Sequence, residues 1–169
     1  MMKKHSAGLV IYRKDKGQLE VLLAHMGSPW WAKKDKGAWS IPKGEYQEDE
    51  DPLHAAKREL KEELGQEMPP GELIELGSIE QNNNKTVIAW AVEANLDVSN
   101  IKSNTVAIEW PPRSGQMQDF PEIDRAVYMN MADAAARIVP GQTGLLERLA
   151  QKLGEPFDQP AEPEQGSLF

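Results

Sequence analysis

The amino-acid sequence predicts a single domain of the mixed α/β or α+β class. Its 169 residues suit one globular domain with a short extension. Strand-like segments come first, one sharply delimited helix follows, and further strands precede two terminal helices, which is a mixed order of elements. We expect residues 1–153 to form the folded domain and the Pro- and Glu-rich residues 154–169 to form a disordered tail.

The N-terminal quarter of the chain is typical of a β-hairpin followed by a loop. Residues 7–12 and 19–24 are apolar runs rich in strand-forming side chains, and Asp15-Lys16-Gly17 between them is a turn sequence. Residues 27–37 have no regular pattern, and we interpret them as a loop. A brief strand is expected at residues 38–41, where a proline ends it.

The clearest helix is predicted over residues 52–64. Asp51 is a good N-cap, and Pro52 occupies the first helical position, where its missing N–H costs nothing. Gly65 is the expected stop signal. Apolar residues at helical spacing form a stripe that should face the core, namely Leu53, Ala56, Leu60 and Leu64.

The second half of the chain contains further strands and two helices. Asn82 to Lys85 form a turn sequence, and the proline-rich residues 111–115 must be a loop. Strands are expected at residues 73–81, 86–92, 105–110 and 125–129, and helices at residues 132–138 and 145–153.

Composition excludes several classes of function. Lys and Arg number 19 against 27 Asp and Glu, so the net charge of −8 argues against binding to a nucleic-acid backbone. Cysteine is absent, which excludes disulfides, thiolate zinc sites and cysteine catalysis and is compatible with a cytoplasmic location. No segment reaches the ~18 apolar residues of a membrane helix, and the N-terminal apolar run is too short for a signal peptide. The sequence gives no prediction of oligomeric state.

Three carboxylates gather on one face of the predicted helix. Glu62 and Glu63 lie three and four residues after Glu59, so all three side chains are neighbours. Like charges at this spacing repel, and a divalent cation such as Mg²⁺ would compensate for them because hard cations prefer oxygen ligands. The alternative is an ordinary solvated helix face neutralised by the interleaved residues Lys57, Arg58 and Lys61.

A longer motif decides between these two interpretations. Seven fixed residues match the pattern G-x5-E-x7-R-E-U-x-E-E-x-G-U, in which U is a bulky aliphatic residue, and a chance match is on the order of 1 in 10⁹ per start site. Gln66 at the final U position departs from the pattern. The fixed residues are Gly44, Glu50, Arg58, Glu59, Glu62, Glu63 and Gly65. This pattern is the Nudix box, and the chain resembles the Nudix (MutT-like) hydrolases.

The resemblance covers about residues 5–153 and includes the approach from Trp39 to Gly44. It implies a mixed β-sheet sandwiched between helices. It also implies a Mg²⁺- or Mn²⁺-dependent hydrolase that cleaves a pyrophosphate linkage in a nucleoside diphosphate joined to another moiety. A dinucleoside polyphosphate or a nucleoside triphosphate would be such a substrate.

Two alternatives to an enzyme differ in class. One is a catalytically inactive nucleotide-binding or regulatory module of the same fold, against which the intact set of glutamates argues. The other is a calcium loop of the EF-hand type, which is excluded because no glycine stands six positions into a loop that starts at Asp49 or Asp51.

The resemblance also assigns roles to residues. Glu59 and Glu63 would be the main metal ligands, with Glu62 and the carbonyl of Lys43 as further ligands. A remote carboxylate usually completes such sites, and we expect it to be Glu122, with Asp124 as the alternative. Catalytic roles fall to three residues: Glu59 or Glu62 would be the general base, and Arg58 would hold Glu50 or a catalytic glutamate in place.

Candidate substrate-binding residues lie mainly in the loops. Lys43, Trp31 and Arg113 are our candidates, Trp31 because an aromatic ring can stack on a base. Packing and solvation are the competing explanations for each. Trp30 is the other candidate for stacking, and Lys33, Lys34 and Lys36 could contact phosphates. Trp39 and Trp90 are interpreted as core residues, and the three histidines share no metal-ligand spacing, so no role is assigned to them.

Overall fold

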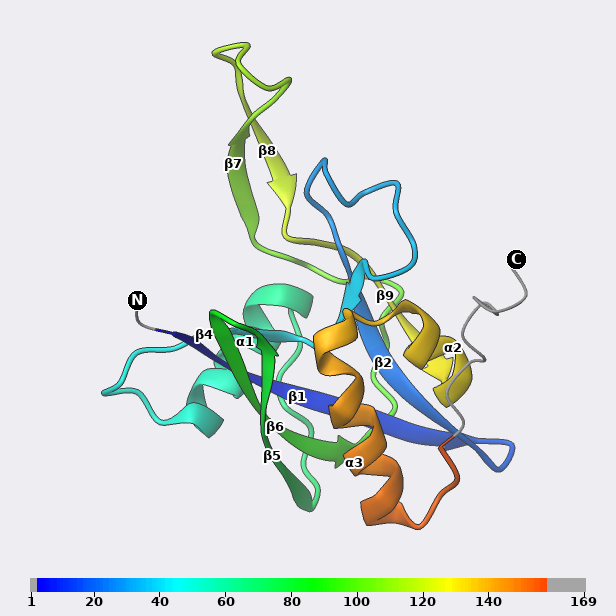
Figure 1. The fold of residues 1–169 in the computed structure, drawn as a ribbon. Helices are drawn as coiled ribbons and strands as arrows, with labels where there is room; N and C mark the ends of the chain where they lie inside the picture. The colour runs from blue at the N-terminus through cyan, green and yellow to red at the C-terminus, as the bar shows by residue number, and fades with distance from the viewer. Residues whose placement is uncertain (1–2, 158–169) are drawn as a thin grey trace, which may run out of the picture.

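The computed structural model describes residues 3–157 (Figure 1). The strands are β1 (Lys4–Asp15), β2 (Gln18–Met26), β3 (Trp39–Ser40), β4 (Lys43–Glu45), β5 (Leu73–Asn82), β6 (Lys85–Glu93), β7 (Thr105–Glu109), β8 (Met117–Pro121) and β9 (Ile123–Asn130). The helices are α1 (Pro52–Leu64), α2 (Met131–Arg137) and α3 (Thr143–Leu153), and a 3₁₀ helix, Pro140–Gln142, precedes α3.

One seven-stranded mixed sheet forms the centre of the domain. Its main path runs β3-β2-β1-β6-β5, while β4 pairs with β1 and β9 pairs with β2. Strands β1 and β6 are parallel, with Leu9 opposite Trp90, and the other pairs in this sheet are antiparallel. Strands β7 and β8 form a separate two-stranded sheet. The mixed sheet expected from the sequence is therefore confirmed.

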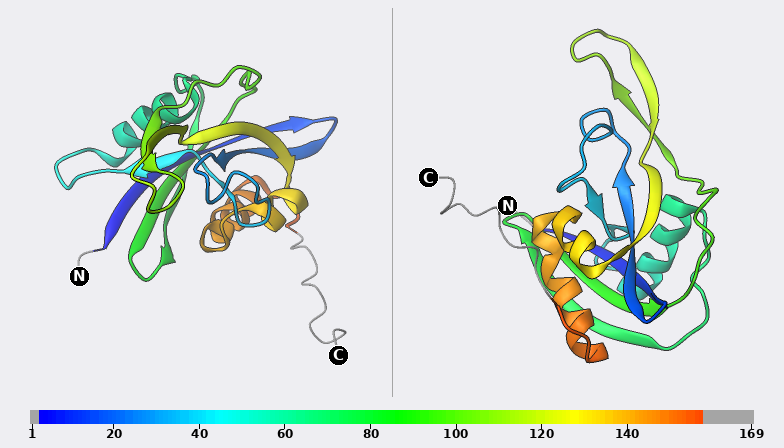
Figure 2. Two further views of the ribbon diagram at one scale, coloured as in Figure 1. Left: turned by 90° about the horizontal axis from the view of Figure 1, so that it is seen from above. Right: turned by 90° about the vertical axis from the view of Figure 1, so that its right-hand side faces the viewer.

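Helices cover both faces of this sheet, as Figure 2 shows. Along β1, Val10 and Tyr12 belong to one hydrophobic cluster, whereas Leu9 and Ile11 belong to the other, because neighbouring side chains of a strand point to opposite faces. The first cluster packs against α2 and α3, and the second packs against α1. The domain therefore has the sandwich of helices and sheet that the resemblance implies.

Helix α1 begins and ends where the sequence predicts. The side chain of Asp51 accepts a hydrogen bond from the backbone N–H of His54, and Gly65 adopts a left-handed conformation with φ 71°. Of the expected apolar stripe, Leu53 is only half-buried. The buried apolar residues of the helix are Ala55, Ala56, Leu60 and Leu64.

Two strands are missing from the sequence prediction. Strand β4 has three residues and gains its partner from β1, with Gly44 opposite Ala7, so the pairing is a long-range contact. Strand β8 contains Asp119 and Pro121 and forms by pairing with β7. Neither segment has the apolar alternation by which strands are recognised locally.

The chain that follows α3 lies against the domain. Phe157 packs on the core cluster of α2 and α3, and Glu155 forms an ion pair of 2.6 Å with Lys14. Residues 158–169, most of the predicted disordered tail, lie outside the described residues, so their disorder stays a prediction.

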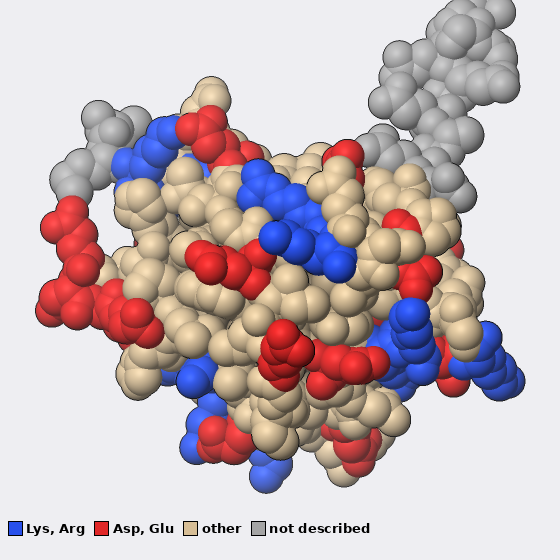
Figure 3. Space-filling view, turned by 90° about the horizontal axis from the view of Figure 1, so that it is seen from below, with Lys and Arg blue, Asp and Glu red and all other residues tan. Residues whose placement is uncertain are grey.

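The described chain has two further properties that bear on partners. Within residues 3–157, no helix has the length and apolar character needed to cross a membrane. On the face that Figure 3 shows, basic and acidic side chains lie in separate, interspersed groups.

Candidate functional site

Strand β4 and helix α1 approach each other at Gly44 and Glu59. A Cβ atom built on Gly44 would lie 1.9 Å from the carboxyl carbon and from Oε1 of Glu59. The side chain of Glu59 is therefore packed against the backbone of β4, and the residue is only 8% exposed. A side chain at position 44 would therefore displace this carboxylate, and glycine leaves room for it.

Arg58 is hydrogen-bonded to three of the neighbouring glutamates. Its Nε and Nη2 donate to the two carboxylate oxygens of Glu50 at 3.0 and 3.1 Å. Its Nη1 donates to Glu59 at 2.6 Å and to Glu62 at 3.3 Å, and Nη2 also donates to the carbonyl of Glu45. The planar guanidinium thus fixes the orientation of several acidic groups at once. It holds Glu50 and a candidate catalytic glutamate together.

The side chain of Glu63 points toward the first residue of β4. The backbone N–H of Lys43 donates to Glu63 Oε1 at 3.3 Å. Burial and the nearby Lys85 lower the pKa of the Lys43 ammonium group, while the charges of Glu63 and Glu59 oppose this shift. Lys43 therefore places both a backbone donor and its amino group among the acids.

Backbone hydrogen bonds bring Glu122 to the same place. The N–H of Asn104 donates to the carbonyl of Glu62 at 2.8 Å, and the carbonyl of Asn104 accepts from the N–H of Glu122 at 2.9 Å. Asn104 thus connects the last turn of α1 to the start of β9. The remote carboxylate nominated from the sequence lies next to the box helix, although the two are far apart along the chain.

The electrostatics of these acids favour their neutral forms. Burial, followed by repulsion from Glu62, raises the pKa of Glu59 to about 7, although Arg58 opposes the shift. Burial also raises the pKa of Glu63 to about 8, with Glu59 and Glu122 adding to the shift and Lys43 opposing it. The pKa of Glu122 is raised as well, by burial and then by Glu62. The site therefore lacks enough positive charge for its carboxylates.

These residues fit a divalent cation by their chemistry. All the candidate side-chain ligands are carboxylates, whose oxygens suit a hard cation. Because Gly44 has no side chain, the Glu59 carboxylate also lies close to the backbone of β4. Among residues 3–157, no three acidic or imidazole side chains already converge on one point. Arg58 accounts for part of this, because it engages oxygens of Glu59 and Glu62.

Comparison with known proteins places this geometry in a family. The family model of the NUDIX domain matches residues 2–149, which is most of the chain. The chain belongs to the Nudix family. No curated protein sequence matches it significantly.

Solved structures share the Nudix fold. A Caenorhabditis elegans Ap4A hydrolase in a binary complex is 24% identical, with a TM-score of 0.59 over 89% of this chain and 98% of the other. The NUDIX domain of Shewanella oneidensis NrtR, complexed with ADP ribose, is 15% identical, with a TM-score of 0.62 over 90% of each chain. A MutT structure from work on Aliivibrio salmonicida and Vibrio cholerae is 18% identical, with a TM-score of 0.53 over 89% and 98% of the two chains. At these identities the likeness concerns the fold.

The departure of Gln66 from the Nudix box has a local explanation. Its side-chain Nε2 donates to the carbonyl of Asp97 at 2.9 Å. The Nudix box has an aliphatic residue at position 66. In this chain Gln66 instead forms a hydrogen bond to the loop beyond β6. The substitution leaves the carboxylates of the box untouched.

The aromatic and basic candidates outside the Nudix box are not all at the surface. Trp31 is half-buried against the core, with the Lys34 ammonium 4.9 Å from its ring centroid, whereas Trp30 is 52% exposed. Arg113 is exposed in the loop that joins β7 to β8, with φ 62°. Lys33, Lys34 and Lys36 are exposed in the loop after β2. Trp30 is therefore the more exposed of the two rings, whereas Trp31 is the one in contact with a basic group.

Sequence reasoning missed the part played by His25. This residue is fully buried, and its Nε2 donates to the carbonyl of Lys34 at 2.6 Å while its Nδ1 lies 2.8 Å from Asp124 Oδ1. His25 therefore joins the loop after β2 to the start of β9. No motif or spacing in the sequence reveals this pairing, which also engages the alternative candidate Asp124 in a structural contact.

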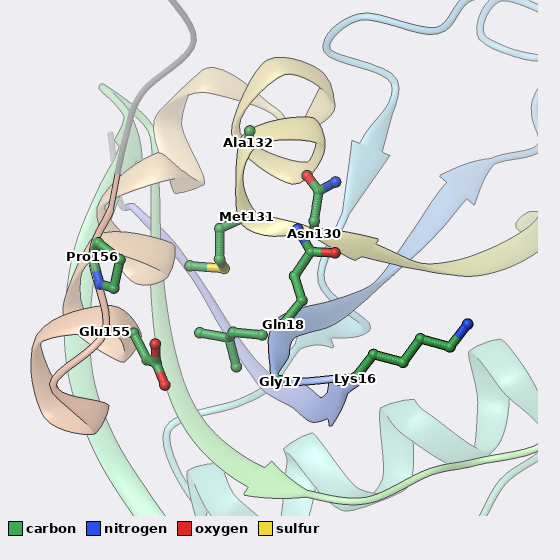
Figure 4. Close-up of a pocket in the computed structure, with 9 residues that line it drawn as sticks. Lys16, Gly17, Gln18, Asn130, Met131, Ala132, Glu155 and Pro156 are labelled. Carbon is green, nitrogen blue, oxygen red and sulfur yellow. The ribbon is translucent and has the colours of Figure 1, made fainter.

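Two pockets differ in their relation to the Nudix box. One of about 660 Å³ adjoins the loop before α1 and is lined by Glu45, Tyr46 and Glu50 together with the first residues of β1. Another of about 370 Å³ lies between the β1–β2 turn, the start of α2 and Glu155 (Figure 4). Glu155 is the one acidic residue of its lining and is paired with Lys14, so this second pocket lacks the carboxylate cluster of the Nudix box.

Proposed function

We propose that this Nudix protein is a Mg²⁺- or Mn²⁺-dependent hydrolase that cleaves a pyrophosphate linkage. Its substrate would be a nucleoside diphosphate joined to another moiety, such as a dinucleoside polyphosphate or a nucleoside triphosphate. The observation that carries the proposal is the gathering of Glu59, Glu62, Glu63 and Glu122, with raised pKa values for three of these four acids. Acids with perturbed pKa values mark functional sites more often than solvated surfaces, and Glu59 is in addition buried.

The residues divide into ligands and positioning groups. We propose that Glu59 and Glu63, assisted by Glu62, Glu122 and the carbonyl of Lys43, hold the cation. When bound, such an ion neutralises phosphate oxygens and lowers the pKa of a coordinated water.

Around these ligands, Arg58 keeps Glu50, Glu59 and Glu62 in fixed orientations through its hydrogen bonds. Glu59 or Glu62 accepts the proton of the attacking water. The side chain of Lys43 supplies a positive charge for the phosphates.

Two features support a nucleotide as the substrate. Nudix family members are pyrophosphohydrolases, and the structural neighbours include an Ap4A hydrolase and a domain complexed with ADP ribose. The exposed lysines of the loop after β2 offer local positive charge on a chain whose net charge is −8. We further propose a small-molecule substrate rather than a nucleic-acid backbone, and a cytoplasmic location.

A non-catalytic module is the second candidate. The NUDIX domain of NrtR, complexed with ADP ribose, has a TM-score of 0.62 to this chain and favours a ligand-binding role. The two candidates differ in turnover, because a module would bind a nucleotide without cleaving it.

The deciding experiment is a screen of phosphoanhydrides with Mg²⁺ and with Mn²⁺. The panel contains dinucleoside polyphosphates, nucleoside triphosphates, ADP-ribose and nucleotide sugars, and the reaction in ¹⁸O-water identifies the bond that breaks. We expect at least one member to be cleaved at a pyrophosphate linkage, with no turnover in EDTA. Binding of several members with no cleavage of any would favour the module.

A further inference from the structure

Two arms of the chain leave the domain from the same point. The loop after β2 begins at Gly27, whose N–H donates to the carbonyl of Glu122 at 2.9 Å. The β7–β8 hairpin ends at Pro121, the residue before Glu122. Figure 1 and the right-hand view of Figure 2 show the loop and the hairpin rising side by side from the sheet. Both arms therefore start next to Glu122, one of the candidate metal ligands.

The two arms meet again at a pair of tryptophans. The rings of Trp30 and Trp110 have centroids 5.6 Å apart and planes inclined by 88°, which is an edge-to-face contact. In such a contact each ring covers at most one face of the other. Trp30 is 52% exposed, so an aromatic surface stays open at the junction of the arms.

The hairpin presents an apolar face at this junction. Val106 and Ile108 alternate along β7 and share one side, Phe120 is the cross-strand partner of Val106, and Trp110 directly follows the strand. A two-stranded hairpin is marginally stable by itself, so an apolar face of this kind gains from being covered. Val106 is nevertheless 39% exposed. The contact with Trp30 therefore leaves part of this face uncovered.

We propose that Trp30 and Trp110 form a stacking platform for the base of a nucleotide whose phosphates lie at the box carboxylates. This inference rests on the proposed function and names the part of the substrate that lies away from the reacting bond. Flat π-faces bind every nucleobase, so the platform would select for the presence of a base more than for its identity.

The lengths of the two arms agree with this placement. Trp30 is three residues from Gly27, a span of at most ~11 Å. Trp110 is five residues from the base of the hairpin at Thr105, a span of ~17 Å. A ribose and the phosphates of a nucleotide bridge a gap of this order. The exposed residues Lys33 and Arg113 lie on the same two arms, each three residues after the platform tryptophan of its arm.

The test compares a ligand that has a base with one that lacks it. Tryptophan fluorescence and calorimetry measure Kd for ADP and for inorganic pyrophosphate, each as its Mg²⁺ complex. The variants are Trp30→Leu and Trp110→Leu, and the control is Met117→Leu, which changes a 63% exposed residue paired with Glu109 in the hairpin. We expect each tryptophan variant to weaken ADP about tenfold more than pyrophosphate, and the control to leave the ratio of the two Kd values unchanged.

Two outcomes would overturn the platform. Equal weakening of both ligands would show that the tryptophans merely hold the hairpin in place, and unchanged Kd values for both ligands would show that no base lies there. Because binding is measured and not turnover, these results are independent of the screen for hydrolysis. An inactive protein with an intact, tryptophan-dependent preference for ADP would retain the platform while refuting the proposed hydrolase.

Discussion

The carboxylate of Glu59 lies where a side chain of residue 44 would begin: its carboxyl carbon is 1.9 Å from the ideal Cβ position of Gly44. Gly44→Ala should therefore displace Glu59 from the site. We expect activity to fall at least about 100-fold and the free energy of unfolding to fall by about 1–3 kcal/mol, as in other overpacked sites. Activity assays and urea unfolding measure the two effects.

The matched control for this substitution is Gly144→Ala in helix α3. A Cβ atom there would meet Ile79 at 3.8 Å, an ordinary van der Waals contact. The control should stabilise the protein by roughly 0.5–1 kcal/mol because alanine favours a helix. A fully active Gly44→Ala variant would contradict the close approach of β4 to the carboxylate.

Arg58→Lys tests whether the several hydrogen bonds of the guanidinium contribute to activity in addition to its positive charge. Lysine keeps the positive charge but cannot donate to both oxygens of Glu50 and to Glu59 at once. We expect kcat to fall about 10–100-fold, as when other groups that orient metal ligands are changed. Lys57→Arg, on the exposed side of the same helix, is the control and should be fully active. Equal kcat for Arg58→Lys and wild type would show that charge alone suffices.

Glu63→Gln should lower turnover while raising the thermal stability of the metal-free protein. The substitution removes a proposed metal ligand without changing volume, so turnover should fall by several orders of magnitude. Because burial disfavours the charged form of Glu63 and raises its pKa, the metal-free variant should melt at a higher temperature than wild type at pH 8. Glu67→Gln, whose side chain is 78% exposed, should change neither property. Near-full Mg²⁺-dependent activity of Glu63→Gln would refute the ligand assignment.

The raised carboxyl pKa values predict how stability depends on pH. Glu59 and Glu63 have pKa values of about 7 and about 8 in the folded protein, against an ordinary value of 4.5. The folded state then binds more protons than the unfolded state, so this stabilisation is complete below pH 4.5 and is lost as pH rises to about 8. Calorimetry in EDTA should show Tm falling over this range.

Two comparisons isolate that effect from other titrating groups. The double variant Glu59→Gln, Glu63→Gln should have a flatter Tm profile between pH 5 and 8 than wild type. Mg²⁺ should raise the Tm of wild type most at the upper end of the range, because it binds the ionised carboxylates. A wild-type profile as flat as that of the double variant would show that these two acids do not titrate within it.

Two truncations test the C-terminal segment. Ending the chain after Phe157 should leave both activity and Tm unchanged, as expected of a passive tail. Ending it after Gly154 also removes the Phe157 packing and the ion pair of Glu155 with Lys14. This second truncation should keep activity but lower the free energy of unfolding by roughly 1 kcal/mol. A large loss of activity after the first truncation would give the tail a function.

The sequence by itself determined the features whose causes are local. Asp51, Pro52 and Gly65 fix the ends of α1 because capping bonds form within one helical turn. The spacing of Glu59, Glu62 and Glu63 along a helix of known pitch places their side chains together, and the longer motif to which they belong resembles the Nudix box.

The tertiary structure decided what depends on residues that are distant in the chain. Strand β4 exists because β1 pairs with it, and Glu122 reaches the box because Asn104 bridges it to α1. The burial of His25 against Asp124 and the choice of Trp30 over Trp31 for exposure follow from how the arms pack. Hydrogen bonds and burial between such residues are set by the closed fold as a whole, and no local pattern of side chains encodes them.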